Sequence, residues 1–445
     1  MFNEHIRSWG NNFSCSANEY SCSSISLAAE IVRSCTSHGI IPRGAGRSYG
    51  DQSLNSGGGL LSLQRSEDSN SYVVTDSGLV TVNGESSIGD LLSAVIPQGW
   101  LLPVVPGSGS ITIGGALAAD AHGKNHFHQS SLASWCKEMN VMIADGSIIR
   151  CSTENEPDLF WATVGGLGLT GLIISATLQL QKITGSSLKV DTRSFSRFSY
   201  LFEGLKMASE NNEYAVAWLD LLSERHPGRG IVKSAHLDKN RNLERGRVDT
   251  KSINFPLSPS VNFINRPMCS IHNSLKYGSS LITRGTAITP ISDFLFPLDR
   301  VNNWKNLYGR AGFLQWQFVV PDEEALLLEN IIKDIGNTDL LPSLAVLKRC
   351  GKESRSYLSF CRPGWTLAID FPSNAKARDL LVGFDKRIAE VGGRVYLAKD
   401  SCLDADLIHK MYPKLDKWKS IRRHFDPKNI WQSDFSRRLN LICNF

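Results

Sequence analysis

Two glycine-dense loops near the N-terminus are suited to a ligand that carries phosphates. The first, residues 42–52, reads PRGAGRSYGDQ, and the second, residues 105–115, reads VPGSGSITIGG. Glycine allows backbone N–H groups to approach a phosphate closely, and the first loop adds Arg43 and Arg47. A single loop of this kind is explained by a tight turn, whereas two such loops predict a long diphosphate ligand. Neither loop continues into Lys-Ser or Lys-Thr, which excludes a P-loop.

Residues 166–171, GLGLTG, match the G-x-G-x-x-G fingerprint of dinucleotide-binding folds. That motif requires a strand before it and a helix after it, so that the pyrophosphate meets a helix N-terminus. Here the order is inverted. Residues 157–162 are typical of a capped helix, and residues 172–181 alternate apolar and polar side chains like a half-buried strand. The sequence therefore does not predict a Rossmann fold.

Three histidines, His122, His126 and His128, stand within seven residues and raise the hypothesis of a metal site. No cysteine, aspartate or glutamate accompanies them at a recurrent ligand spacing, and clustered histidines alone are a weak zinc signal. We therefore predict no metal site and expect His126 and His128 to be structural.

Composition narrows the class of protein. The chain has 445 residues, of which 42% are apolar and 20% charged, so it is neither disordered, collagen-like nor a coiled coil. A net charge of +5 is too small to predict nucleic-acid binding. Residues 1–10 lack the apolar run of a signal peptide, and the ten cysteines show no C-x-x-C pair. We expect reduced, mostly buried thiols and a cytoplasmic location, with peripheral attachment to the inner membrane surface left open.

The periodic segments predict an α+β protein. An Asp-Gly turn at 145–146 between two apolar runs predicts a hairpin. Helices are expected over residues 23–38, 86–97, 323–336 and 374–391, and strands over 59–63, 72–75, 79–82, 314–320 and 394–398. In the run 314–320, glutamines alternate with apolar and aromatic side chains. Its polar face could line a cavity, or it could face solvent as one side of an antiparallel sheet.

The short motifs resemble the FAD-binding (PCMH-type) domain of the vanillyl-alcohol-oxidase family. They are PRGAGRSYGD at 42–51, TIGGA at 112–116, HGKNH at 122–126, LFWATVGG at 159–166 and GLTG at 168–171. The likeness extends to GFLQWQF at 312–318, AKDS at 398–401 and DFSRRL at 434–439. Over nearly its whole length, the sequence is similar in particular to the decaprenylphosphoryl-ribose 2′-oxidase branch of the family.

The resemblance implies a two-domain flavoprotein. Residues 1–185 would form the FAD-binding domain, residues 186–393 a substrate domain built on an antiparallel sheet with flanking helices, and residues 394–445 a segment that returns to the FAD domain. In many relatives the first loop carries a histidine bonded covalently to the flavin, and here Arg47-Ser48-Tyr49 fills that stretch, so we expect noncovalent FAD. The implied cofactor contacts are Arg43, Gly44, Ala45, Gly46, Arg47, Ser48, Tyr49, Gly50, Gly107, Thr112, Ile113, Gly114, Gly115, Ala119, His122, Ile173 and Tyr396.

The resemblance also implies the catalytic and substrate residues. Lys399 matches the family's essential lysine, which either takes the hydroxyl proton or stabilises the reduced flavin, and His122 and Tyr49 would lie near the ring. Without the resemblance, Lys399 would be interpreted as an exposed lysine at a strand end. The implied substrate contacts are Gln315, Gln317, Lys348, Trp218 and Thr366; the alternatives are a solvated lysine for Lys348 and a core aromatic for Trp218.

The implied reaction is FAD-dependent oxidation of a secondary hydroxyl of a sugar to a ketone. The expected substrate is the 2′-hydroxyl of a polyprenylphosphoryl pentose, and a separate short-chain NAD(P)H-dependent reductase would complete the epimerisation. The alternatives are an aldonolactone or sugar-alcohol oxidase acting on a soluble sugar, and a noncatalytic flavin-fold binding protein. Thr366, Ala368 and Leu295 depart from the family's asparagine, cysteine and tyrosine, which alters hydrogen bonding and shape around the sugar. Ala368 also predicts that thiol-directed ligands will not label this pocket.

Overall fold

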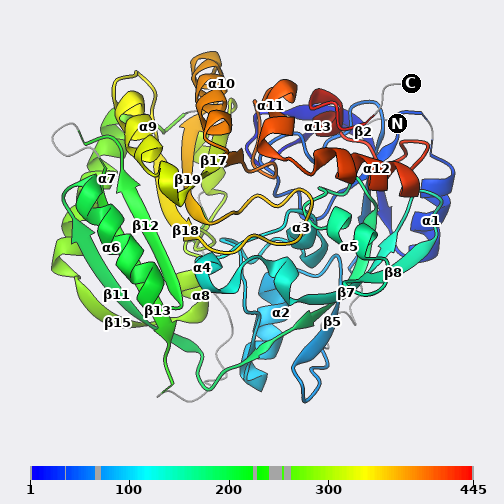
Figure 1. Cartoon of the computed structure of the whole chain (residues 1–445), viewed down its shortest axis with the longest axis horizontal. Coiled ribbons are helices and arrows are strands. Elements are labelled where there is room, and N and C mark those ends of the chain that lie inside the picture. The colour runs from blue at the N-terminus through cyan, green and yellow to red at the C-terminus, as the bar shows by residue number, and fades with distance from the viewer. Residues whose placement is uncertain are drawn as a thin grey trace.

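The chain is arranged around one large β-sheet that lies beside two small ones (Figure 1). The computed structural model describes residues 3–35, 37–65, 72–223, 228–239, 253–254 and 262–442. Short two-stranded pairs connect the parts: β6 (Trp100–Leu101) with β10 (Gln181–Lys182), and β14 (Ile253–Asn254) with β16 (Val301–Asn302).

The two small sheets are formed by residues from the first half of the chain. One, in the order β1-β2-β4-β3, contains β1 (Asn3–Arg7), β2 (Ser14–Cys22), β4 (Gly59–Leu63) and β3 (Ile40–Pro42). The other is antiparallel, in the order β5-β9-β7-β8, with β5 (Leu79–Asn83), β9 (Leu172–Gln179), β7 (Cys136–Met142) and β8 (Ile148–Ser152). Their helices are α1 (Ile25–Arg33), α2 (Ile88–Val95), α3 (Ile113–Ala118), α4 (His126–Gln129) and α5 (Pro157–Thr163).

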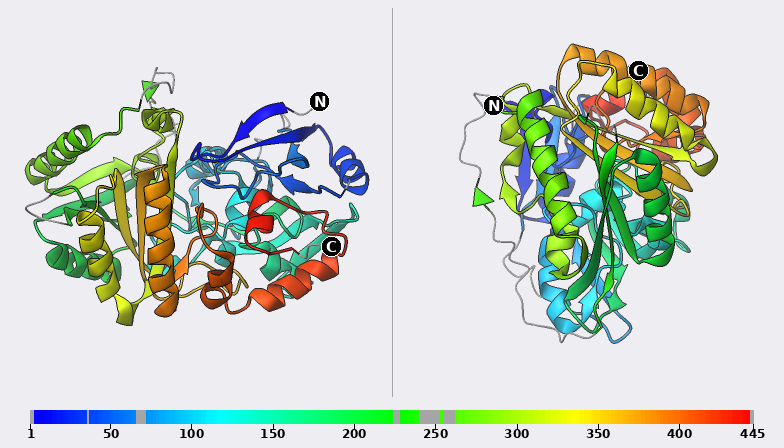
Figure 2. Two further views of the ribbon diagram at one scale, coloured as in Figure 1. Left: turned by 90° about the horizontal axis from the view of Figure 1, so that it is seen from above. Right: turned by 90° about the vertical axis from the view of Figure 1, so that its left-hand side faces the viewer.

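The large sheet has eight antiparallel strands in the order β15-β11-β13-β12-β18-β19-β17-β20. These are β15 (Gly285–Pro290), β11 (Ser187–Phe195), β13 (Arg229–Leu237), β12 (Tyr214–Asp220), β18 (Leu344–Cys350), β19 (Gly364–Pro372), β17 (Phe313–Pro321) and β20 (Arg394–Val395). The helices around it are α6 (Phe198–Asn211), α7 (Arg266–Ile282), α8 (Ile291–Leu295), α9 (Leu326–Gly336) and α10 (Ala375–Glu390). Helices α6 and α7 cover opposite faces of the sheet (Figure 2).

The C-terminal segment leaves the large sheet after β20 and returns to the N-terminal sheets. It contains α11 (Ala405–Met411), α12 (Leu415–Phe425) and α13 (Asp434–Arg438). The buried Trp418 donates its indole N–H to the Ala162 carbonyl (2.9 Å), and the Ile40 amide donates to the Ile430 carbonyl (2.7 Å). Both ends of the chain therefore contribute to one packed unit, as Figure 1 shows.

Most expected elements are present, with informative differences. The hairpin at Asp145-Gly146 and the strand after residue 171 are confirmed, so the G-x-G-x-x-G match is not followed by a helix. The strand expected over 394–398 is wrong beyond Val395, because the Lys399 amide closes a turn onto the Tyr396 carbonyl (2.9 Å). The second glycine loop ends earlier than expected, since Thr112 caps α3.

Three further differences concern helix and strand ends. The first helix ends at Arg33 rather than at residue 38, and residues 72–75 form only an isolated bridge at Val74. Helix α7 was not expected, and the structure shows that it leaves several large apolar side chains exposed. Among the described residues, no helix is long and apolar enough to cross a membrane.

Candidate active site

A cavity of about 630 Å³ lies where the glycine loops meet the large sheet. Most residues expected at a flavin and sugar site line it, and they come from segments far apart in the sequence. The lining residues from that set are Arg43, Gly44, Ala45, Gly46, Arg47, Ser48, Tyr49, Gly107, Thr112, Gly114, Gly115, Ala119, His122, Ile173, Gln315, Gln317, Lys348, Tyr396 and Lys399. Gly50, Ile113, Trp218 and Thr366 are not among the lining residues.

The first glycine loop is held in shape by its own arginine. Arg43 donates to the carbonyls of Ser53 (2.9 Å) and Arg7 (3.0 Å), so its guanidinium braces the loop, while its neighbours line the cavity. Gly46 has φ +61°, a conformation that favours glycine, and a Cβ there would lie 2.6 Å from the Arg43 guanidinium. Arg47 instead stacks over the Trp9 ring at 3.9 Å. The Arg43 guanidinium is thus held within the loop, although Arg43 lines the cavity together with its neighbours.

The second loop meets the first beside α3. The Thr112 hydroxyl accepts from the Gly115 amide (3.2 Å), and Gly44 abuts the Thr112 side chain so closely that a Cβ could not fit. On the cavity side, a Cβ at Gly107 would find no atom within 4 Å. Asp299 accepts from the Gly109 amide (2.7 Å) and fixes the loop to the large-sheet side. Together the two loops form a glycine-lined cradle.

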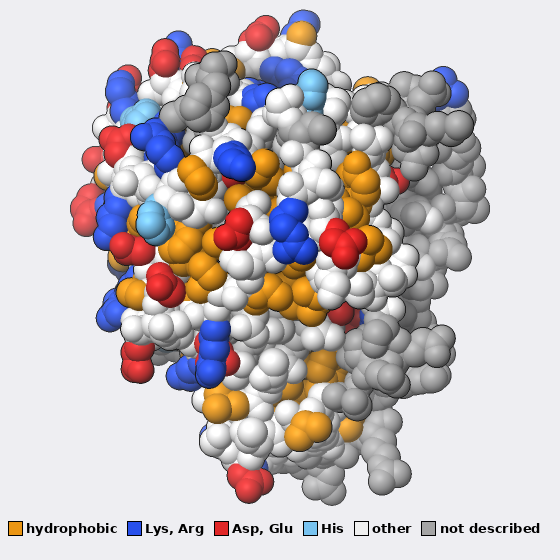
Figure 3. Space-filling model, turned by 90° about the vertical axis from the view of Figure 1, so that its right-hand side faces the viewer, with side chains coloured by type: hydrophobic (Ala, Val, Ile, Leu, Met, Phe, Trp, Pro, Cys, Tyr) orange, Lys and Arg blue, Asp and Glu red, His pale blue; other side chains and the backbone are white. Residues whose placement is uncertain are grey.

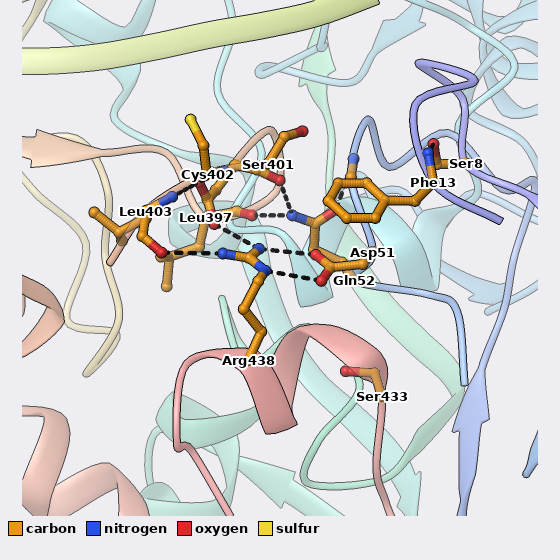
Figure 4. Close-up of polar contacts among 12 residues, drawn as sticks. Ser8, Phe13, Asp51, Gln52, Leu397, Ser401, Cys402, Leu403, Ser433 and Arg438 are labelled. Carbon is orange, nitrogen blue, oxygen red and sulfur yellow. Dashed lines mark hydrogen bonds and ion pairs between the residues drawn. The ribbon is translucent and has the colours of Figure 1, made fainter. Parts of the chain in front are cut away.

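A buried polar network attaches the C-terminal segment to the first loop (Figure 4). Arg438 donates to both oxygens of Asp51 (2.9 and 2.8 Å) and to Asp400 (2.8 Å). Gln52 donates to the carbonyls of Leu397 and Asp400, both at 2.7 Å. We call Asp51, Gln52, Asp400 and Arg438 the clamp. Because Asp400 follows Lys399 directly, the clamp places that lysine against the cavity.

Lys399 faces an acidic partner that the sequence analysis missed. Burial and the positive charge of Lys348 lower the pKa of Lys399 to about 7, against the opposing effect of Asp370. Burial raises the pKa of Asp370 to about 7, against the opposing Gln315 hydrogen bond (2.6 Å) and the Lys399 charge. The Lys399 ammonium also lies 5.4 Å from the Tyr49 ring centre. Lys399, which lines the cavity, therefore interacts with a carboxyl group that also titrates near neutrality.

His122 and Gln317 form a second buried polar pair on the cavity wall. The His122 Nε2 and Gln317 Nε2 atoms are 3.0 Å apart, and Gln317 also donates to the Thr366 hydroxyl (3.0 Å). Burial, followed by the positive charges of Lys348, His126 and Lys399, lowers the pKa of His122 well below 6.5. His122 is therefore neutral at pH 7 and accepts a hydrogen bond from Gln317. Tyr396 packs at 5.2 Å from its ring and donates to the Ala119 carbonyl (2.7 Å).

Two more lysines add positive charge to the same cavity. Burial lowers the pKa of Lys348. Burial and the neighbouring charges of Lys348 and Lys233 lower the pKa of Lys124 to about 7, although its ammonium donates to the Leu295 carbonyl (2.7 Å). The interpretation of Lys348 as a solvated surface lysine is therefore wrong. Lys124 stood in a recognised motif, but its spacing gave no reason to assign it a role.

The glutamine strand is buried along its whole length, so the solvent-facing alternative is wrong. Trp218 lies outside the cavity lining and packs under the Lys276 ammonium, 4.4 Å from its ring centre. Thr366 is fully buried behind Gln317. Asp370 could have been found from the alternation of β19, since it lies two residues after Ala368, which lines the cavity.

The polar atoms of this cavity fit a polar ligand. In the described part of the chain, four buried atoms of cavity-lining residues lack a hydrogen-bond partner: Arg47 Nε, His122 Nδ1, Gln315 Oε1 and Gln317 Oε1. Buried polar atoms are normally satisfied, so several orphans around one cavity indicate groups that await a ligand. The glycine cradle and these atoms fit a cofactor that carries a diphosphate, such as FAD.

Behind the cavity, His126 meets two cysteines. The imidazole nitrogen of His126 and the Sγ atoms of Cys350 and Cys361 lie within 4.8 Å of one another, and the two Sγ atoms are 3.2 Å apart. His126 Nδ1 accepts from the Gly351 amide (3.1 Å), while its Nε2 has no partner among the described residues. The set could hold a metal ion, and its cysteines were too distant in sequence to be linked to the histidines. The prediction of no metal remains a prediction.

Comparison with known proteins gives two family matches. Residues 20–152 match the FAD binding domain family, and residues 313–439 match the D-arabinono-1,4-lactone oxidase family. These two regions contain the glycine loops and the lysine end of the cavity, respectively.

Individual relatives cover much more of the chain. It is 35% identical over 420 residues to decaprenylphosphoryl-beta-D-ribose oxidase of Mycolicibacterium smegmatis, covering 91% of this chain and 90% of that protein. It is 31% identical over 369 residues to the "Uncharacterized protein in mprA 5'region" of Streptomyces coelicolor, covering 79% and 99%. Cytokinin dehydrogenase 6 of Oryza sativa is 31% identical over 163 residues, covering 34% and 31%.

Proposed function

The chain belongs to the family of FAD-dependent oxidoreductases that includes decaprenylphosphoryl-beta-D-ribose oxidase, and from this we propose that its substrate is a lipid-linked sugar. The chain is an FAD-dependent oxidoreductase that acts on CH–OH groups. Its proposed reaction oxidises the 2′-hydroxyl of a polyprenylphosphoryl pentose to a ketone. A separate reductase would then complete an epimerisation in cell-surface polysaccharide synthesis.

One observation supports a phosphorylated sugar above all. Three lysines, Lys124, Lys348 and Lys399, line one cavity beside the glutamines of the fully buried strand β17. Such glutamines can orient sugar hydroxyls. Burial lowers the pKa of Lys124 and of Lys348, and the charge of Lys348 lowers the pKa of Lys124 further, so a phosphate would stabilise both ammonium groups. An uncharged sugar would leave these buried charges uncompensated.

Different residues of the chain have different roles around the reacting carbon. The two glycine loops would hold FAD, and its isoalloxazine would supply the hydride acceptor for the sugar carbon. Lys399, with its pKa near 7, takes the proton from the hydroxyl, and Asp370 balances the charge that Lys399 gains. Neutral His122 and Gln317 hold the hydroxyls in place. The surrounding buried side chains exclude water.

We propose that FAD is bound without a covalent link. Residues 42–52 contain neither histidine nor cysteine, so the first loop has no side chain of the usual attachment type. Acid precipitation of the purified protein should release all yellow colour into the supernatant. Flavin fluorescence that stays with the denatured band would contradict this proposal.

The decisive experiment is anaerobic titration of the purified holoenzyme. A short-chain polyprenylphosphoryl pentose should bleach the flavin absorbance near 450 nm, as expected for a bound flavin that is reduced. Free pentoses and aldonolactones should not bleach it at the same concentration. The match to the lactone oxidase family supports a second candidate, oxidation of a soluble lactone, and the reverse outcome would favour that candidate.

A further inference from the structure

Helix α7 exposes apolar side chains and buries polar ones. Its buried residues are Cys269, Asn273 and Ser280. Four of its exposed large apolar side chains have exposed fractions of 55% (Met268), 61% (Ile271), 69% (Leu275) and 85% (Ile282). At 3.6 residues per turn, these four positions lie along one side of the helix, opposite the buried ones. We call Met268, Ile271, Leu275 and Ile282 the apolar stripe.

Polar contacts fix this orientation. Asn273 donates to the buried carboxylate of Asp220 (2.9 Å), and the hydroxyls of Ser280 and Ser194 lie 2.7 Å apart. Turning the apolar stripe inward would break these contacts and bury it against polar groups. The stripe therefore faces outward as a consequence of the fold, and Figure 2 shows α7 on the outer side of the large sheet.

The charge around the apolar stripe has one sign. Residues 262–292 contain Arg266, His272, Lys276 and Arg284 but no aspartate or glutamate. The face shown in Figure 3 differs, because acidic and basic side chains there lie among the hydrophobic ones. An apolar helix face whose own segment carries Arg266, Lys276 and Arg284 and no acidic residue complements an anionic lipid surface better than it complements another copy of this positively charged chain.

Helix α7 also lies next to the cavity. Val216 lines the cavity, and Trp218, two residues later on the same face of β12, packs under Lys276 of α7. Lys233 on β13 pairs directly with Val216. Lys233 and Lys276 thus continue the positive charge of the cavity lysines toward the helix, and burial, followed by the charge of Lys233, lowers the pKa of Lys276 to about 8.

We propose that the apolar stripe of α7 docks the enzyme on an anionic lipid bilayer, with the lysines beside it facing the phosphate of a lipid-linked sugar. The proposal rests on the proposed function only for the identity of that sugar. Docking would keep the polyprenyl chain in the bilayer while the sugar enters the cavity. It would therefore position the cavity beside its substrate.

The test is vesicle flotation of the holoenzyme, without substrate. Vesicles of phosphatidylcholine with about one third phosphatidylglycerol should carry the protein, and vesicles of phosphatidylcholine alone should carry at least about tenfold less, since basic groups near the surface favour anionic lipid. The double variant Ile271→Asp/Leu275→Asp should lose at least tenfold of the binding. Leu326→Asp, a control on α9 with 68% exposure on the opposite side of the sheet, should bind like the parent.

Three results would overturn the proposal. They are parent protein that floats with neither vesicle, an α7 variant that floats like the parent, and a parent dimer that the α7 variant converts to a monomer. The last would make the stripe an interface between two copies. Flavin content and melting temperature show that each variant is folded. Bleaching by a detergent-dispersed substrate should be the same in the α7 variant and the parent, so failure of docking and failure of the proposed reaction are distinguishable.

Discussion

Two buried polar clusters, the clamp and the polar side chains of the cavity wall, meet where Asp400 follows Lys399. They differ in whether their polar atoms have hydrogen-bond partners. In the clamp, the side chains of Asp51, Gln52, Asp400 and Arg438 all have their hydrogen-bond partners within the chain. In the cavity, Gln315, Gln317 and His122 each keep a buried atom without a partner in the described part of the chain. Polar burial alone therefore does not indicate function. A satisfied cluster holds the fold together, and an unsatisfied one indicates where a ligand belongs.

The largest effect on activity should come from Lys399, which lies between the clamp and the cavity wall. Lys399→Ala should lower the rate of flavin reduction by about 10²–10⁴-fold, because the proton acceptor is lost. Melting temperature and FAD content should stay close to those of the parent, since Lys399 lies outside the clamp. Stopped-flow reduction measures the rate.

Lys399→Arg provides the matched control for this change. Arginine keeps the positive charge but remains protonated, so it should not restore the rate if Lys399 is the base. An arginine variant with near-parent rates would show that Lys399 acts through its charge alone.

A substitution in the clamp should lower the stability of the protein and leave the rate of flavin reduction nearly unchanged. Arg438→Leu leaves the carboxylates of Asp51 and Asp400 buried and unpaired, which should cost about 3–5 kcal/mol of unfolding free energy. Urea unfolding followed by tryptophan fluorescence measures this loss. The FAD-saturated, folded fraction should reduce its flavin at near the parent rate. A stable variant without activity would place the clamp in the active site instead.

The pH profile tests the coupling between Lys399 and Asp370. Lys399 must be neutral to accept a proton, so kcat/KM should rise about tenfold per pH unit below its pKa near 7 and level off above it. The negative charge of Asp370 raises the pKa of Lys399, so Asp370→Asn should move the inflection to lower pH. A rate that falls as the pH rises through 7 would contradict the assignment of Lys399 as the base.

A substitution of Gln317, whose buried side-chain oxygen lacks a partner among the described residues, should have a smaller effect on activity. Gln317→Leu keeps the approximate volume but removes the contacts to His122 and Thr366, so KM should rise about tenfold, the scale of one hydrogen bond of about 1–1.5 kcal/mol. Unfolding free energy should change by less than about 1 kcal/mol, because a buried orphan oxygen is removed as well. A large loss of stability would move Gln317 into the structural class.

The smallest expected effect concerns the cluster of His126, Cys350 and Cys361. Two thiolates on one tetrahedral zinc ion lie about 3.8 Å apart, given zinc–sulfur distances of about 2.3 Å, whereas these sulfur atoms are 3.2 Å apart. Lys348 adds a positive charge nearby. Elemental analysis of purified protein should therefore find far less than one metal ion per chain, and chelators should leave the melting temperature unchanged. Stoichiometric zinc would contradict this prediction.

Local sequence determined the parts of the protein that depend on neighbouring residues. The glycine loops, the Asp145-Gly146 hairpin, and the strand that follows residue 171 were all predictable, because turns, caps and alternation act over a few residues. The family motifs extended this to FAD and to Lys399, which the cavity brings together with Tyr49 and His122. The identity of the sugar and the domain boundaries stay predictions.

Tertiary structure alone decided which polar side chains are paired and which are not. Asp370 and Gln315 are 55 residues apart, and Cys361 and His126 are farther still, so no spacing in the sequence links them. The same holds for the orientation of α7. Its apolar positions suggest burial, but in the structure its polar side faces the sheet, where Asn273 donates to Asp220. Spacing along a chain encodes local geometry, whereas pairing and burial depend on contacts that form only when distant segments fold together.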